Sequence, residues 1–134
     1  MANMSVFDIA GRAMSAQLVR LNTTASNLAN AGSVSATKEG AFRALKPVFH
    51  AVGDLAAGTA TVQVDQVIAG QVEPTRLHSP GHPLADRNGD VWAAGVDQAA
   101  ELVEMVETSR QYQNNVQVLQ TAKTLTLDTL RIGK

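Results

Sequence analysis

The first hydrophobic pattern in the chain lies near its start, where apolar residues recur at alternating steps of three and four. This spacing is typical of a helix with a single apolar seam, as in coiled coils. No proline occurs between Met4 and Asn30, and Gly32 follows shortly after. Asparagine and glycine are common where helices end, so we expect the helix to end near Asn30. The seam positions are Met4, Phe7, Met14, Leu18, Leu21, Ala25 and Leu28.

The same spacing returns at the other end of the chain and predicts a second, longer helix. From about Asp97 to Arg131 there is neither proline nor glycine. At 1.5 Å per residue the two helices would be roughly 40 Å and roughly 50 Å long, more than the middle of the chain can cover. The second seam comprises Leu102, Met105, Ser109, Tyr112, Val116, Leu119, Lys123, Thr126 and Leu130.

Further apolar residues lie beside each seam, so pairing the two helices would still leave apolar surface exposed. These residues are Ile9, Ala13, Val103, Val106, Val118, Leu125 and Leu127. Exposed apolar stripes usually mark a contact with another chain. The pattern therefore indicates a protein that assembles through its helices.

The middle of the chain follows a different pattern, with short extended segments and turns. Residues 61–68 alternate apolar and polar side chains, which predicts a half-buried strand. Residues 42–49 include Pro47, which suits an edge strand. Three prolines precede Asn88 and Gly89, a pair that favours a turn. We expect Trp92 to pack this middle segment against the last helix.

The expected fold is therefore mainly α with a small β insert. Long N- and C-terminal helices pack as a coiled-coil-like pair, and the segment between them is β-rich and irregular. The length of 134 residues corresponds to one ordinary domain. Within it we expect residues 1–30 and 96–134 to form an inner helical domain, with residues 31–95 as the middle segment.

Composition narrows the classes of partner. Eleven basic and twelve acidic residues give a formal net charge of −1, which offers no electrostatic reason to bind nucleic acid or an anionic membrane. The chain has no cysteine, which excludes disulfides and thiolate chemistry. No window resembles a membrane span, and the first ten residues do not resemble a secretory signal. We expect neither nucleic-acid binding nor direct membrane insertion.

Candidate chemistry is sparse. His78 and His82 are four residues apart, but Pro80 makes a helix there implausible and no third metal ligand is evident. Asp86 and Asp90 flank the predicted turn, where carboxylates commonly stabilise the backbone. We therefore expect no catalytic, cofactor-binding or metal-binding residue, and no enzymatic activity.

Two motifs resemble those of the flagellar rod, hook and axial protein family. Leu21 with the run Ala25 to Asn30 is similar to an L-x-x-x-A-S-N-L-A-N pattern near the N-terminus of that family. Glu101 to Val103 resembles its E-M-V pattern, with Leu102 in place of methionine. Arg110, Tyr112, Gln113 and Asn115 are similar to R-x-Y-Q-x-N. The nine-residue loop from Ala31 to Glu39 and the short length resemble rod members rather than hook members.

The resemblance implies a structural subunit of the bacterial flagellar basal-body proximal rod, a tubular drive shaft that transmits torque from the motor to the hook and filament. It implies contacts with copies of itself, other rod proteins, a rod-base adaptor and neighbouring ring proteins. It also implies a rod that spans the periplasm, and type III export without a cleaved signal peptide. The expected assembly interface consists of Phe7, Met14, Leu18, Leu21, Ala25, Asn27, Leu28, Asn30, Leu102, Met105, Tyr112, Gln113, Asn115, Val116, Leu119 and Leu130.

Within that set, some residues have a simpler alternative. Asn30 suits a helix C-terminus, and Tyr112 suits an ordinary core position, whereas Asn27 lies one turn inside the helix, where a polar seam residue can set register. Two other functions stay open from the residues alone. One is an adaptor or export chaperone that holds a client on its apolar stripes, and the other is an enzyme that opens the cell wall, for which no coherent set of catalytic groups is present.

Overall fold

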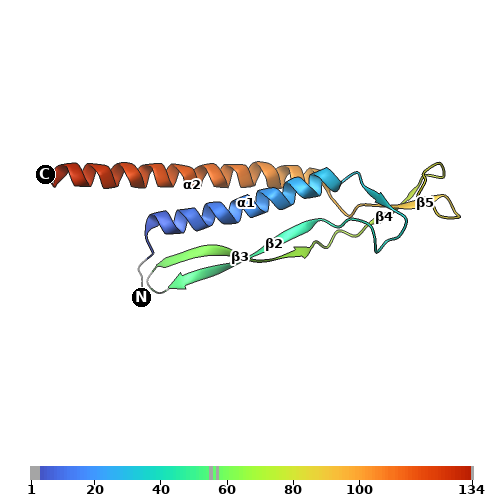
Figure 1. Cartoon of the computed structure of the whole chain (residues 1–134), viewed down its shortest axis with the longest axis horizontal. Coiled ribbons are helices and arrows are strands. Elements are labelled where there is room, and N and C mark those ends of the chain that lie inside the picture. The colour runs from blue at the N-terminus through green and yellow to red at the C-terminus, as the bar shows by residue number, and fades with distance from the viewer. Residues whose placement is uncertain (1–3, 55, 57, 134) are drawn as a thin grey trace.

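The computed structural model of the chain describes residues 4–54, 56 and 58–133, and Figure 1 shows an elongated molecule. Two long antiparallel helices lie side by side, with a β-hairpin along the shorter helix and a small sheet at one end of the molecule. The elements are α1 (Val6–Asn30), β1 (Val34–Ser35), β2 (Leu45–Asp54), β3 (Thr59–Ala69), β4 (Thr75–His78), β5 (Asp90–Ala93) and α2 (Gln98–Ile132). Both predicted long helices and the β-containing middle are confirmed.

Local chemistry explains where the helices begin and end. Ser5 and Asp8 form a capping box at the start of α1, in which each side chain accepts a hydrogen bond from the backbone of the other residue. At the end of α1, Asn30 donates its side-chain amide to the carbonyl of Ser26 at 2.9 Å. Asp97 caps α2 by accepting a hydrogen bond from the backbone of Ala100.

The middle segment is more regular than its composition suggests. β2 and β3 form a long antiparallel hairpin with one irregularity between Val48 and Phe49. The strand predicted at residues 61–68 lies inside β3, and the strand predicted at 42–49 begins later, at Leu45, and continues to Asp54. Because this sheet has only two strands, Pro47 is on an edge as expected.

The remaining strands form a small sheet in the order β1-β5-β4. The predicted turn at Asn88 and Gly89 is confirmed, with Gly89 at a φ of 79° and the Asp86 carboxylate accepting hydrogen bonds from the backbones of Asn88 and Asp90. The expectation for Trp92 is wrong. Its ring lies in this sheet beside the cations of Lys38 and Arg76, at 6.0 and 5.5 Å, and no strand of the sheet packs against α2 in the described part of the chain.

α1 packs between the hairpin and α2, so its two sides are covered within the molecule. The hydroxyl of Thr61 in β3 donates to the carbonyl of Ile9 at 3.2 Å, which ties the hairpin to the early part of α1. α2 packs mainly against α1, and its first turn also contacts β2 through Lys46 and Glu101. Its last turns extend beyond the start of α1, where no other described element lies alongside (Figure 1). The longer helix is therefore covered on one side.

The line of closest packing does not coincide with the predicted seams. On α1 the fully buried residues are Ala10, Ala16, Thr24 and Asn27, and on α2 they are Glu101 and Thr108. These side chains are small or polar. The larger apolar residues of the α1 seam flank this line and stay half-buried or exposed. Small residues on the buried line let the backbones of α1, α2 and the hairpin approach closely.

Candidate assembly interface

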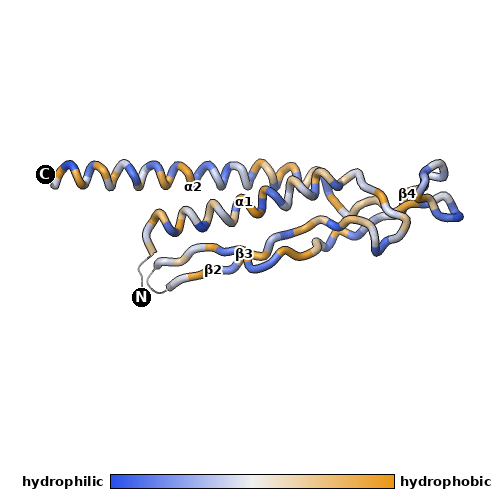
Figure 2. Tube along the Cα trace, viewed as in Figure 1, coloured by the Kyte–Doolittle hydropathy of each residue, from blue (hydrophilic) through white to orange (hydrophobic). Residues whose placement is uncertain are grey.

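The largest exposed apolar surface belongs to α2. Eight of its large apolar side chains are exposed, compared with three on α1. Figure 2 shows hydrophobic positions recurring along α2 as far as its C-terminal turns. The eight are Leu102, Val103, Val106, Val118, Leu125, Leu127, Leu130 and Ile132. Exposed apolar side chains in this number on one helix are the kind of surface that another chain covers.

The exposed residues fall into two groups along α2. Near the start of the helix, Leu102, Val103 and Val106 line a shallow hollow together with Glu107 and Arg110. Val103 is 66% exposed. The second group lies on the last turns, where Leu130 is 65% exposed. Both groups present apolar side chains next to charged ones, an arrangement that suits a specific protein contact.

The predicted interface residues divide into three classes by exposure. Asn27 is fully buried and its partners belong to the same chain. Half-buried positions, mostly along the α1–α2 contact, are Met14, Leu21, Leu28, Asn30, Met105, Tyr112, Asn115, Val116 and Leu119. The exposed positions are Phe7, Leu18, Ala25, Leu102, Gln113 and Leu130. Only the exposed class is fully available to another subunit in this conformation.

Asn27 is the centre of a buried polar junction, defined here as the Asn27 side chain, the backbone of Leu45, and the side chains of Lys46 and Glu101. The Asn27 oxygen accepts the Leu45 N–H at 2.7 Å, and its amide donates to the Leu45 carbonyl at 2.9 Å. The same amide group donates to Glu101 at 3.0 Å. Lys46 forms an ion pair with the other oxygen of Glu101 at 2.7 Å. α1, α2 and β2 therefore meet at this point.

A second ion pair lies further along the two helices. Arg20 on α1 donates to Glu104 on α2, and both side chains are about three-quarters covered. This hydrogen bond holds the pKa of the Glu104 carboxyl below its ordinary value and raises the pKa of Arg20. The buried Thr108 follows one turn later and bonds back to the Glu104 carbonyl at 2.7 Å. Polar contacts thus continue along the inner part of the α1–α2 contact.

The sequence patterns did not single out several of these residues. From the sequence, Glu101 was named only as part of a family motif, and no role was assigned to Arg20, Lys46 or Glu104. Val103, Val106, Leu125 and Leu127 were predicted to lie beside the seam and outside the interface, yet all four are exposed. Glu101 lies seven residues, or two helical turns, before Thr108 and therefore on the same side of α2. A charged residue at a position that the helical repeat places on the buried side is the signal that could have revealed the junction.

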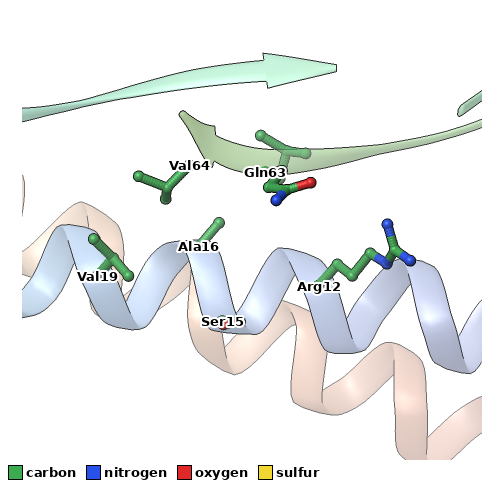
Figure 3. A pocket seen from close by; sticks show the side chains of 7 residues that line it. Arg12, Ser15, Ala16, Val19, Gln63 and Val64 are labelled. Carbon is green, nitrogen blue, oxygen red and sulfur yellow. The ribbon is translucent and has the colours of Figure 1, made fainter. Parts of the chain in front are cut away.

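A groove runs between α1 and the hairpin, and Figure 3 shows it from close by. Ala16 points from α1 towards β3, where Gln63 and Val64 lie opposite, and Arg12 stands at the edge. The groove is open and partly polar, and it contains no arrangement of catalytic groups. It marks the place where a small residue on α1 lets the hairpin come close.

Nothing in the described residues forms a cluster of three or more candidate metal ligands. His78 is paired with Asp90 at 2.8 Å, and His82 accepts a hydrogen bond from the backbone of Leu84. Within the described residues, no helix has the length and apolar character that a membrane crossing requires.

Comparison with known proteins places these features among flagellar components. Residues 7–34 match the family model described as flagella basal body rod protein, and residues 87–132 match that described as flagellar basal body rod FlgEFG protein C-terminal. The flagellar basal-body rod protein FlgC of Salmonella typhimurium is 46% identical over the whole of both chains. The proteins of the same name from Escherichia coli O157:H7 and Yersinia enterocolitica are 44% and 42% identical, again over the whole of both chains.

Proposed function

The chain belongs to the family of flagellar basal-body rod proteins named FlgC and is a structural subunit rather than an enzyme, and we propose that it assembles into the proximal rod through the exposed faces of its two long helices. Membership of this family places it in the flagellar basal body, in assembly with other rod proteins. The observation that carries the proposal is the set of eight exposed large apolar side chains on α2.

The energetics favour assembly over an isolated subunit. Burying apolar surface contributes about 25 cal/mol per Å² removed from water. A large exposed leucine or valine therefore gains on the order of 1 kcal/mol or more when a neighbouring subunit covers it. The eight exposed side chains of α2 therefore favour a contact with a neighbouring subunit. In the rod we expect α1 and α2 to stay together as a coiled-coil-like pair.

The proposal includes a division of labour within the chain. Residues 1–30 and 96–134 form the inner helical domain that builds the tube and transmits torque to the hook and filament. Residues 31–95 form the middle segment, of which β2 and β3 lie against α1. The expected interface is the set named from the sequence without the buried Asn27, extended by the exposed Val103, Val106, Leu125 and Leu127.

Further partners belong to the proposal through family resemblance alone. These are copies of the chain, a rod-base adaptor, neighbouring ring proteins and the type III export apparatus. The rod would span the periplasm, and the subunit would reach it without a cleaved signal peptide.

The test places a charge on the exposed face without touching the interior. Val106→Asp and Leu130→Asp alter residues that are 61% and 65% exposed. We expect each variant to keep the unfolding free energy of the monomer within about 0.5 kcal/mol, because exposed substitutions are usually that mild. Each should be missing from purified basal bodies and abolish swimming, because a charge would have to be buried at the contact.

Gln120→Asp is the matched control, since it adds the same charge at an exposed polar position of α2. It should swim normally. Leu21 and Leu28 are less suitable positions for this test, because they are half-buried within the subunit and a charge there would also disturb the fold. Normal motility in both Val106→Asp and Leu130→Asp would contradict the proposal.

A further inference from the structure

We infer that the buried polar junction of Asn27, Leu45, Lys46 and Glu101 is a positioning device, which holds the β2–β3 hairpin at one fixed place on the helix pair before the subunit joins the rod. The positioning acts within a single subunit and does not depend on how subunits contact one another. Asn27 is the positioning residue, because its side chain bonds both to β2 and to α2.

The geometry at β2 is that of strand pairing. In an antiparallel ladder, two residues exchange N–H and carbonyl hydrogen bonds, and the Asn27 amide makes the same two bonds with Leu45. A shift of the hairpin by one residue along α1 would break both bonds together. Hydrophobic contacts with the small side chains of α1 are less directional and do not select one register so sharply. The amide therefore specifies where the hairpin starts.

Glu101 makes the arrangement depend on α2. Its side chain is 3% exposed and accepts from Asn27 on one oxygen and from Lys46 on the other. A buried carboxylate without such partners is strongly disfavoured. In turn, the Glu101 carboxylate accepts the second N–H of the Asn27 amide, which would otherwise be buried without a partner. The three elements satisfy one another only in this relative placement, which is the behaviour of a register-setting polar contact.

The junction consists of different residues from those proposed for assembly, although Leu102, which directly follows Glu101, belongs to the proposed interface. It lies where α1 ends and α2 begins, next to the middle segment and far from the uncovered last turns of α2 (Figure 1). The exposed residues proposed to contact other subunits include none of its members. The hairpin can therefore be ordered in a free subunit before the distant end of α2 contacts a neighbouring subunit.

A reversal of donor and acceptor tests the inference. Asn27→Asp replaces the donating amide by a carboxylate that faces the Glu101 oxygen, across a contact of 3.0 Å in the parent. Glu101→Gln supplies an amide that can donate to the carboxylate introduced by Asn27→Asp, while its oxygen still accepts from Lys46. We expect each single variant to be less stable than the parent and the double variant to recover part of the loss. Asn22→Asp is the matched control on the exposed side of α1.

The readout must report position as well as stability. The chain has no cysteine, so cysteines introduced at the exposed Gln66 on β3 and Gln111 on α2 accept spin labels at those two sites only. In the purified parent and in Asn22→Asp we expect one narrow distance distribution. In Asn27→Ala and Asn27→Asp it should broaden, and in the Asn27→Asp/Glu101→Gln double variant it should narrow again.

Hydrogen exchange gives a second, local measurement. The Leu45 amide donates to Asn27, so its exchange should accelerate about tenfold or more in Asn27→Ala, the change expected for loss of one or two hydrogen bonds. An unchanged distance distribution and unchanged Leu45 exchange in Asn27→Ala would overturn the inference. So would a double variant no better than Asn27→Asp. Both experiments use free subunits, so their failure would leave the assembly proposal untouched.

Discussion

The two ends of the helix pair differ in what they bury. At the inner end, where α1 ends and α2 begins, Asn27 and Glu101 are buried at 0% and 2% exposure and satisfied by polar partners in the same chain. At the outer end, the last turns of α2 expose Leu125, Leu130 and Ile132. The buried polar groups of the inner end find their partners within the subunit, although Leu102, Val103 and Val106 beside them stay exposed. The outer end presents apolar surface without a partner in the described part of the chain.

This difference teaches how a small subunit can be both specific and incomplete. Directional polar contacts select one arrangement but contribute modest net stability, whereas apolar contacts contribute more and select less. In this chain, polar contacts fix the placement of its own elements, and exposed apolar side chains are left for contacts with other subunits. The following variants test whether the inner end carries the stability of the monomer.

Gly95→Ala should have the largest effect on the monomer. A Cβ at this position would lie 2.3 Å from the carbonyl oxygen of Val72 and 3.0 Å from backbone atoms of Glu73 and Pro74, so the backbone at the inner end must shift. We expect a loss of about 2–3 kcal/mol of unfolding free energy, as for overpacking in a tight site. Urea denaturation measures it. Gly81→Ala is the control, because nothing lies within 4 Å of its Cβ, and equal stability of both variants would contradict the close approach.

Glu104→Gln should have a smaller and pH-dependent effect. The bond from Arg20 lowers the pKa of Glu104 in the folded state, so the ion pair stabilises the fold above the unfolded pKa and is lost as pH falls through the lower, folded pKa. At pH 7 we expect the variant to lose about 1 kcal/mol, discounted for partial exposure. Thermal unfolding at a series of pH values should show the difference from the parent shrinking below about pH 4. A constant difference down to about pH 2 would rule out this origin.

Ser5→Ala should have the smallest effect on global stability. It removes the cap of α1 at the outer end and also the hydroxyl hydrogen bond to Asp8, the larger of the two bonds from Ser5 that hold the pKa of Asp8 below its ordinary value. Because the helix end is far from the junction, we expect faster amide exchange in the first turn with little change in the unfolding midpoint. Asp97→Ala removes the corresponding cap of α2 at the inner end. It should shift the midpoint more, and the reverse order would contradict the assignment of stability to the inner end.

Part of the fold was predictable because it depends on local rules. The helix pattern, the Asn88–Gly89 turn and the strand within residues 61–68 follow from periodicity and turn chemistry, and each was found where expected. The seam was predicted from large apolar residues, but Ala10, Ala16 and Thr24 occupy the buried line on α1. Periodicity shows that a helix has a face, and it does not show which face meets its own chain and which meets another.

The residues predicted for the interface divide between the surface and the interior of the subunit. Leu102 and Leu130 are exposed as an assembly surface requires, whereas Asn27 lies inside the subunit. Its side chain reaches a strand 18 residues away and a helix 74 residues away along the chain. No spacing rule connects such distant positions, so only the folded arrangement could show that one amide serves both.

From the sequence alone came the two long helices, the β-containing middle, the absence of catalytic groups and the kinship with flagellar rod proteins, because these depend on residue types and on spacing along the chain. The tertiary structure alone decided that α1 lies between the hairpin and α2, that α2 keeps an uncovered face, and that Asn27, Lys46 and Glu101 meet. The physical reason is that burial and hydrogen bonding depend on distances in space, which chain order constrains only between near neighbours.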